Sequence, residues 1–260
     1  MSKFQPGGII SLMTDFGIED DYSGLLHAAI LGINSKVRVV DLCHTIPPGD
    51  IETASFILSH DYRYFPEGTV FVAIVDPGVG SEREILAALV NNYIFLAPDN
   101  GLLHPILLES EQADVYLVEN ESYFLSDVSS TFHGRDIFAP VAAHLASGLD
   151  ISELGRRAET WNKTIEICPE RREDKTVGKV IYVDRFGNLI TNIPSEILET
   201  HSITIAKMKL RRVETFSEGK PNEVVCLAGS KETVEIVSNG GNAFQIAGFE
   251  AGTVIVASPA

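Results

Sequence analysis

The pattern of hydrophobic and polar positions differs between the two ends of the chain. Before about residue 170, apolar runs with the spacing of strands alternate with runs that have the spacing of helices. Strands are predicted over 9–13, 37–42, 69–75, 85–90 and 93–96, and helices over 22–33, 51–62 and 138–145. Asn91-Asn92 separates two of these strands and predicts a hairpin turn. This alternation indicates an α/β domain with a mostly parallel sheet covered on both faces.

The remainder of the chain has short strand patterns separated by turn residues. They cover 177–183, 189–192, 203–205, 224–227, 234–237 and 253–257. Such spacing is typical of a small antiparallel barrel or sandwich. The polar stretch before them has no hydrophobic period and contains Pro169. We therefore expect an α/β domain over 1–168, a linker over 169–176 and a β-barrel domain over 177–260.

Composition and charge narrow the class of protein. The 260 residues are 45% hydrophobic, enough for a sizeable core, yet no apolar run reaches the length of about 20 residues needed to span a membrane. We see no secretory signal, and the three cysteines lack the spacing of a disulfide framework or zinc knuckle, so a cytoplasmic protein is predicted. The net charge of −16 lies entirely in residues 1–170, which carry 9 basic and 25 acidic residues, and it argues against a nucleic-acid partner.

Acidic residues follow several of the predicted strands. Asp15, Asp41 and Asp76 each stand at or just after a strand, where ligands of parallel sheets usually bind. Asp15 precedes Phe16-Gly17 instead of a helix, which favours a functional role, whereas Asp21 fits a helix N-cap and Asp41 a turn.

Other candidates have structural interpretations. His27, His60 and His144 fall within predicted helices, where surface or core positions are expected. The glycines of 77–80 match neither a P-loop nor a dinucleotide fingerprint. Asp15, Asp20, Asp76, His104 and His133 could in principle form a hydrolase metal site, but no two have a recognised ligand spacing, so no metal and no cofactor are predicted.

Five motifs in one order resemble a specific family. They are Leu12-Met-Thr-Asp-Phe-Gly17, Val75-Asp-Pro-Gly-Val-Gly80, Ala97-Pro-Asp-Asn-Gly101, Thr131-Phe-His-Gly-Arg-Asp136 and Asp184-Arg-Phe-Gly-Asn188. Together they resemble the S-adenosyl-L-methionine (SAM) hydroxide adenosyltransferases, SAM hydrolases related to fluorinase and chlorinase. The resemblance implies an α/β domain and a β-barrel domain, metal-free hydrolysis of SAM to adenosine and L-methionine, and a homotrimer with the site at the subunit interface.

The resemblance also implies roles for individual residues. Asp76, Arg83 and His133 match the catalytic set of the hydrolases, whereas the halogenating relatives have other residues at the Asp and His positions. The substrate-binding positions are as follows: Asp15 for the ribose hydroxyls, Asp184 and Ser230 for the methionine ammonium and carboxylate, and Asn188, Asn239 and Gly240 for adenine. Lys231 replaces the arginine that follows the serine in the halogenases. Phe132 and Phe186 could enclose the adenine or pack in a core.

The expected chemistry suits these residues. The leaving group is a neutral thioether, so the protein must supply an aligned water or hydroxide and an acceptor for its proton. Proton acceptance by His133 or Asp76 and capture of hydroxide by Arg83 remain open at this point. Three other functions compete: halide transfer, SAM or adenosine binding without turnover, and metal-dependent hydrolysis of another nucleoside.

Overall fold

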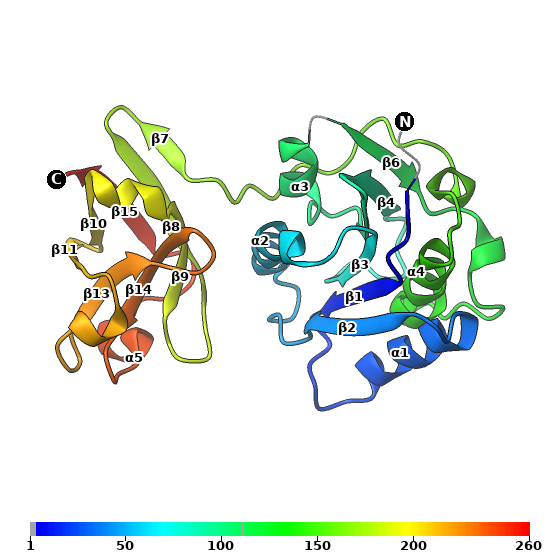
Figure 1. The fold of residues 1–260 in the computed structure, drawn as a ribbon, viewed down its shortest axis with the longest axis horizontal. Helices are drawn as coiled ribbons and strands as arrows, with labels where there is room; N and C mark the ends of the chain where they lie inside the picture. The colour runs from blue at the N-terminus through cyan, green and yellow to red at the C-terminus, as the bar shows by residue number, and fades with distance from the viewer. Residues whose placement is uncertain (1–3, 111) are drawn as a thin grey trace. The chain divides into compact units, whose positions relative to one another are not determined.

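A computed structural model describes residues 4–110 and 112–260 of the chain. The chain divides into two compact units, Met1–Glu166 and Ile167–Ala260 (Figure 1). No helix among the described residues is long and apolar enough to cross a membrane.

The first unit contains a six-stranded sheet of order β2-β1-β3-β5-β4-β6. The strands are β1 (Ile9–Thr14), β2 (Arg38–Cys43), β3 (Thr69–Ile74), β4 (Ile85–Val90), β5 (Tyr93–Pro98) and β6 (Ala113–Leu117). β2, β1, β3 and β5 pair in parallel, whereas β4 pairs antiparallel with both β5 and β6. The sheet is therefore mixed, and the expectation of a mostly parallel sheet holds only for the β2-β1-β3-β5 part. The reason is local, because the β4–β5 hairpin places an antiparallel strand inside the sheet.

Helices cover both faces of this sheet, as predicted. The helices are α1 (Tyr22–Ile33), α2 (Ile51–Asp61), α3 (His104–Glu109) and α4 (Ala139–Ala146). Successive side chains of β3 alternate between two hydrophobic clusters, because neighbouring residues of a strand point to opposite faces. One cluster contains Val70, Val72 and Ile74 with residues of α1 and α4, and the other contains Phe71 and Ala73 with residues of α2 and α3.

The second unit is a nearly closed, barrel-like sheet of order β11-β10-β15-β8-β9-β14-β13-β12, with β7 paired to β8. Its elements are β7 (Glu170–Arg172), β8 (Lys175–Val183), β9 (Leu189–Pro194), β10 (His201–Ile205), β11 (Met208–Lys209), β12 (Arg211–Arg212), β13 (Val224–Ala228), β14 (Thr233–Ser238), α5 (Ala243–Ala247) and β15 (Val254–Pro259). Only Leu210 separates the end strands β11 and β12. Residues 169–176, expected as a linker, contain β7 and the start of β8, because Glu170–Arg172 pairs with Lys175–Val177 as a hairpin.

The three cysteines have different surroundings. Cys226 lies buried in β13, Cys43 is half-buried at the end of β2, and Cys168 is exposed close to the boundary between the two units. None of the three forms a disulfide.

Candidate functional site

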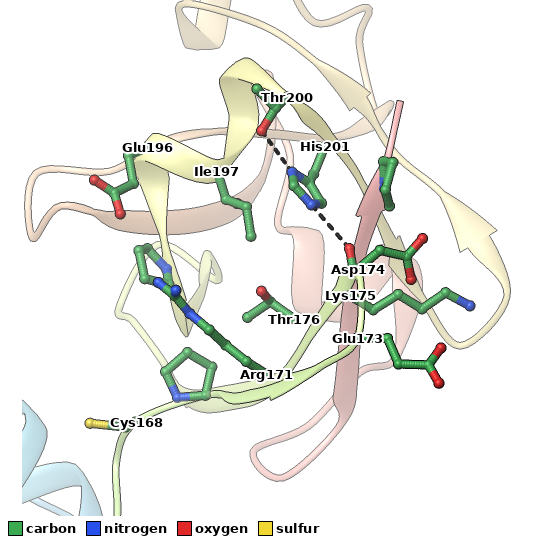
Figure 2. Close-up of a pocket in the computed structure, with 13 residues that line it drawn as sticks. Cys168, Arg171, Glu173, Asp174, Lys175, Thr176, Glu196, Ile197, Thr200 and His201 are labelled. Carbon is green, nitrogen blue, oxygen red and sulfur yellow. Dashed lines mark hydrogen bonds between the residues drawn. The ribbon is translucent and has the colours of Figure 1, made fainter.

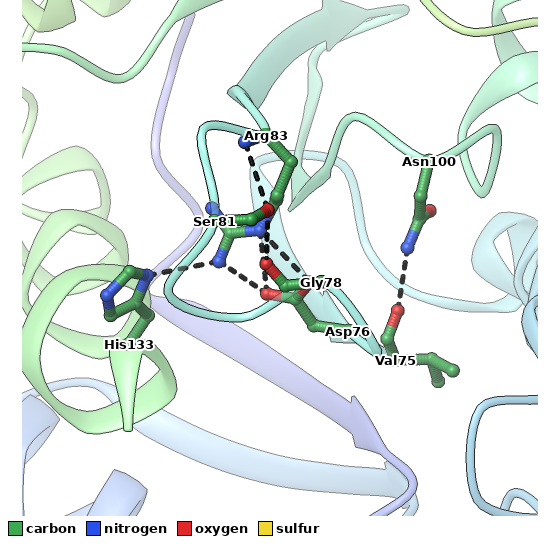
Figure 3. A network of polar contacts seen from close by, with 7 residues as sticks. All are labelled: Val75, Asp76, Gly78, Ser81, Arg83, Asn100 and His133. Atoms are coloured by element: carbon green, nitrogen blue, oxygen red, sulfur yellow. Dashed lines mark hydrogen bonds and ion pairs between the residues drawn. The ribbon is translucent and has the colours of Figure 1, made fainter. Parts of the chain in front are cut away.

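Asp76, Arg83 and His133 form one connected network (Figure 3). The Arg83 Nε atom lies 3.0 Å and 2.9 Å from the two carboxylate oxygens of Asp76, and Arg83 Nη2 also donates to Asp76 Oδ2. The same Nη2 atom lies 3.1 Å from His133 Nδ1. The Asp76 and Arg83 side chains are only 5% and 12% exposed. One guanidinium nitrogen therefore joins a carboxylate and an imidazole in a largely buried network.

Tight turns position the first two members of this network. Asp76 follows β3, and Arg83 precedes β4. Between them, the Val79 N–H donates to the Asp76 carbonyl, and the Ser81 hydroxyl donates to the Gly78 carbonyl over 2.7 Å. Gly80 has a φ of +78° and lies so close to the Ser130 carbonyl that a Cβ atom there would be only 2.4 Å from that oxygen. The loop that carries Asp76 and Arg83 thus contacts the segment that leads to His133.

A π-helical turn over Gly134–Phe138 positions the third member. His133 immediately precedes this turn, which runs into α4. The fully buried Asp136 accepts hydrogen bonds from the Ser129 N–H and the Arg135 guanidinium, and this ties the incoming loop to the turn. We did not predict the π-helical turn, because its five residues, Gly134–Phe138, are too few and too mixed in polarity to give a distinct period.

The network determines which nitrogen of neutral His133 carries the proton. A guanidinium only donates hydrogen bonds, so His133 Nδ1 must accept from Arg83, and the proton then lies on Nε2. Burial, and secondly the positive charge of Arg83, lower the pKa of His133 below its ordinary value of 6.5. The neutral imidazole with an Nε2–H donor is therefore the form expected near neutral pH.

Asp76 and His133 line a cavity of about 410 Å³ together with Asp15. Asp15 follows β1, and its Oδ2 atom accepts a hydrogen bond of 2.8 Å from the Gly49 N–H. The cavity also contains an aromatic cluster of Phe16, Tyr22 and Phe132, whose ring centroids lie 5.2 to 5.9 Å apart. The cavity therefore combines an apolar wall with two carboxylates and an imidazole.

The sequence analysis missed part of this cavity. It gave no site role to Phe16, Tyr22 or Arg135, all of which line it. Phe16 and Arg135 each belong to a motif that also contains a predicted site residue, and this proximity could have identified them. Tyr22 begins α1, and its helical spacing favoured a purely structural interpretation.

In the second unit, Asp184, Phe186 and Asn188 lie in the β8–β9 turn. Asp184 Oδ1 accepts hydrogen bonds of 2.8 Å from the main-chain N–H groups of Phe186 and Asn188, and Asp184 Oδ2 accepts one of 2.9 Å from Asn188 Nδ2. Asn188 is buried, whereas the Phe186 ring is 76% exposed and does not pack in the core. The carboxylate of Asp184 thus shapes the turn and presents an aromatic ring to solvent.

Asn239 and Gly240 lie beside this turn, after β14. The Phe244 N–H donates to the Gly187 carbonyl, and a Cβ atom on Gly187 would collide with the side chain of Asn242. Asn239 Nδ2 donates to the Gly219 carbonyl over 2.8 Å, and Gly240 has a φ of +66°. The loop after β14, which contains Asn239 and Gly240, therefore contacts the β8–β9 turn of Asn188 through Asn242 and Phe244.

Ser230 and Lys231 lie elsewhere in the same unit, in the β13–β14 turn at the opposite end of β14. β14 runs antiparallel to β9, with Thr233 paired to Pro194 and Ile236 paired to Leu189. The C-terminal end of β14 therefore lies beside the start of β9, and its N-terminal end lies beside the end of β9. The main chain of Ser230 donates a hydrogen bond to the Glu235 carboxylate. Ser230 and Lys231 therefore lie at the other end of β14 from Asn239, but the charges of Asp184 and Lys231 both act on the Glu235 carboxylate that Ser230 contacts.

A larger cavity of about 880 Å³ lies in the second unit (Figure 2). Its lining includes Arg171, Lys175, Glu196 and His201. His201 contacts the Thr200 hydroxyl at 2.7 Å and the Asp174 carbonyl at 3.2 Å. None of the predicted site residues lines this cavity, and its side chains show no arrangement for catalysis. The smaller cavity is therefore the candidate active site.

Of the metal ligands considered from the sequence, Asp15, Asp76 and His133 line one cavity, whereas Asp20 and His104 do not. Among residues 4–110 and 112–260, the one group of histidine, cysteine and acidic side chains whose ligand atoms lie within 4.8 Å of one another is His27, Asp41 and His44. Asp15, Asp20, Asp76, His104 and His133 do not belong to it. Sequence reasoning missed this group because its members come from a helix, a strand and a loop.

Comparison with known families gives matches along both units. Residues 10–155 match the model of the SAM hydroxide adenosyltransferase N-terminal domain, and residues 178–256 match that of the C-terminal domain. The chain is 34% identical over 249 residues to a protein of Salinispora tropica named (R)-S-adenosyl-L-methionine hydrolase, with 94% of this chain and 95% of that protein covered.

More distant relatives include halogenating enzymes. A protein of Nocardia brasiliensis named fluorinase is 31% identical over 222 residues, which cover 74% of this chain and 73% of that protein. Among solved structures, an uncharacterized conserved protein from Thermotoga maritima superimposes with a TM-score of 0.89 at 32% identity, covering 96% of this chain and 99% of the other.

Proposed function

The chain belongs to the SAM hydroxide adenosyltransferase family, and from this we propose that it is an enzyme that hydrolyses S-adenosyl-L-methionine to adenosine and L-methionine. The observation that carries the proposal is the network of Asp76, Arg83 and His133, of which Asp76 and His133 line a cavity with Asp15. Relatives named (R)-S-adenosyl-L-methionine hydrolase match over nearly the whole chain, whereas the fluorinase relatives match a smaller part.

The reaction is a displacement at the ribose C5′ atom. A bond forms between the oxygen of water and C5′, the bond between C5′ and the sulfonium sulfur breaks, and the electron pair leaves on the thioether of methionine. This leaving group is neutral, so it needs neither a general acid nor a Lewis acid. The protein must exclude bulk water, align the attacking oxygen and accept its proton.

We assign these tasks to the three residues of the network. Arg83 holds Asp76 through hydrogen bonds from both Nε and Nη2 and fixes the tautomer of His133. His133 then offers an Nε2–H donor to a lone pair of the attacking oxygen, and the Asp76 carboxylate accepts the proton that the oxygen releases. This assignment disfavours His133 as the general base, since its other nitrogen already accepts a hydrogen bond from Arg83.

The substrate-binding roles rest on the family resemblance and on the placement of the side chains. We propose that the Asp15 carboxylate binds the two ribose hydroxyls, because its two oxygens can each accept a hydrogen bond from one hydroxyl. We propose that Asp184 binds the methionine ammonium, and that Asn188, Asn239 and Gly240 with the exposed ring of Phe186 bind adenine. For Ser230 and Lys231 the proposed contact is the methionine carboxylate.

We further propose a cytoplasmic homotrimer with the site at the subunit interface. This proposal rests on the resemblance alone. Light scattering coupled to size-exclusion chromatography measures the mass directly, and a monomer in active samples would contradict it.

Turnover of SAM in the presence of EDTA tests the proposed function. Liquid chromatography should show adenosine and L-methionine in equal amounts, and water labelled with ¹⁸O should place the label in the 5′-hydroxyl of adenosine. His133→Asn should lower kcat by about two to three orders of magnitude, the usual cost of removing one positioned hydrogen-bond donor from a reaction site.

His144→Asn is the matched control, because His144 is also half-buried, has a pKa lowered by burial and lies outside the cavity. It should keep turnover near the wild-type value. Intact SAM after prolonged incubation contradicts hydrolysis, and a 5′-halo product in the presence of halide would instead identify a halide transferase. Equal effects of both substitutions would contradict the role of His133.

A further inference from the structure

Three side chains outside the catalytic network converge on one point. His27 comes from α1, Asp41 from β2, and His44 from the connection between β2 and α2. The Nε2 atom of His27 lies 2.8 Å, and that of His44 3.0 Å, from the same oxygen, Asp41 Oδ1. Two imidazole nitrogens and one carboxylate are the ligand types that borderline divalent metals prefer.

The surroundings of His44 orient its Nε2 atom toward this point. The His44 side chain is 5% exposed, and its Nδ1 atom lies 2.8 Å from the Thr14 hydroxyl. When Nδ1–H donates to this hydroxyl, Nε2 presents a lone pair, as it does in histidines that ligate metals. His44 Nε2 is fully buried and, despite its closeness to Asp41, has no partner in aligned hydrogen-bond geometry. In this tautomer, the buried Nε2 atom has a lone pair that no hydrogen bond uses, 3.0 Å from Asp41 Oδ1.

The other two ligands give access to the site. The side chains of His27 and Asp41 are 31% and 45% exposed, so an ion can enter and keep a water ligand on the open side. The two histidine Nε2 atoms now lie 2.8 and 3.0 Å from Asp41 Oδ1. These three atoms need to move apart only slightly for an ion to lie between them at ligand distances of about 2.0–2.2 Å.

We propose that His27, Asp41 and His44 bind one divalent transition-metal ion, with Zn²⁺ as the preferred ion. Mg²⁺ and Ca²⁺ are disfavoured because they take oxygen ligands. The site is separate from the Asp76–Arg83–His133 network, and the ion takes no part in the displacement at C5′.

The ion would connect α1 and β2 to the segment that carries Asp15. The His44 carbonyl accepts a hydrogen bond of 2.7 Å from the Gly17 N–H, and Thr14 directly precedes Asp15. Binding to the folded state alone raises the stability of that state. We therefore expect the ion to stabilise this edge of the first unit, while SAM turnover by the folded enzyme does not depend on it.

Titration of the full chain with ZnCl₂ tests the proposal. The protein is first treated with EDTA, dialysed and alkylated at its accessible thiols, and binding is followed by calorimetry. Wild type should bind one Zn²⁺ per chain, and its thermal midpoint should rise with Zn²⁺. His27→Gln and Asp41→Asn should each weaken binding by at least about tenfold and lose the thermal shift. Co²⁺ should give visible absorption bands in wild type that both variants lose.

His201→Gln and Cys43→Ser are the matched controls. The first removes a histidine from the other unit, and the second removes the thiol adjacent to His44; both should bind Zn²⁺ as wild type does. Circular dichroism establishes that His27→Gln and Asp41→Asn are folded. Absence of saturable binding by wild type overturns the proposal, and so does undiminished binding by the two folded ligand variants.

Discussion

The two ring nitrogens of His133 have different surroundings. Arg83 donates a hydrogen bond to Nδ1, so a second proton can be added to Nδ1 only if this hydrogen bond is lost. Protonation would also place the imidazolium cation next to the Arg83 guanidinium cation. The sequence predicted that these two residues and Asp76 act together, but only through the family resemblance. The 50 residues between Arg83 and His133 give no local pattern that would bring them together, and the tautomer follows only from the tertiary contact.

The lowered pKa of His133 leads to a prediction about stability and pH. Because this pKa is below 6.5 in the folded state, the unfolded chain takes up the proton first as the pH falls. The free energy of unfolding should therefore decrease as the pH falls through 6.5. Once the pH is below the pKa of His133 in the folded state, this residue should cause no further decrease. Chemical denaturation at about pH 8 and about pH 5 should show a smaller decrease for His133→Asn than for wild type. An equal decrease would contradict the buried neutral imidazole.

At the scale of elements, the long periodic segments were predicted well. The spacing of apolar residues predicted α1 over its observed range, Tyr22–Ile33. The hairpin at Asn91-Asn92 was also confirmed, and both residues have the positive φ angles that such a turn requires. The elements α3 and β6 were not predicted, because the six residues of α3 are too few for a helical period to stand out and Asp114 interrupts the apolar pattern of β6.

The close contact between Gly80 and Ser130 predicts an effect on catalysis. A Cβ atom at Gly80 would press on the Ser130 carbonyl and separate the loop of Asp76 and Arg83 from the segment of His133. Gly80→Ala should therefore lower kcat/KM by about 100-fold, the cost of a misplacement of about 1 Å.

Gly148→Ala is the control for this substitution. Gly148 also has a positive φ, +97°, but no atom lies within 4 Å of a Cβ at that position. Both substitutions should cost about 1–2 kcal/mol of stability through backbone strain, and only Gly80→Ala should impair turnover of SAM. Equal kcat/KM values in the two variants would show that the contact has no part in positioning the network.

At the scale of the whole molecule, charge is distributed unevenly. Residues 1–170 carry a net charge of 9 − 25 = −16, whereas residues 171–260 carry 11 − 11 = 0. The candidate active site lies in the acidic part, and SAM is a cation at neutral pH because its sulfonium and ammonium groups outnumber its carboxylate. The acidic unit should therefore attract the substrate.

Ionic strength should change the rate of substrate capture accordingly. Raising the salt concentration from about 0.01 M to 1 M shortens the Debye length from about 30 Å to 3 Å, and kcat/KM for SAM should fall by about tenfold or more. Binding of adenosine, which is uncharged, should change much less over the same range. Equal salt effects on both ligands would show that the charge of the unit does not act on the substrate.

The cysteines of the chain offer a practical route to spectroscopy. Burial raises the pKa of the Cys226 thiol to about 11, which keeps it protonated and unreactive at neutral pH, and Cys43 is half-buried. Cys168 is exposed and lies two residues after Glu166, where the first unit ends. A maleimide dye added in limiting amount to the native protein should therefore attach mainly at Cys168, where its fluorescence can report on the beginning of the second unit without any engineered substitution.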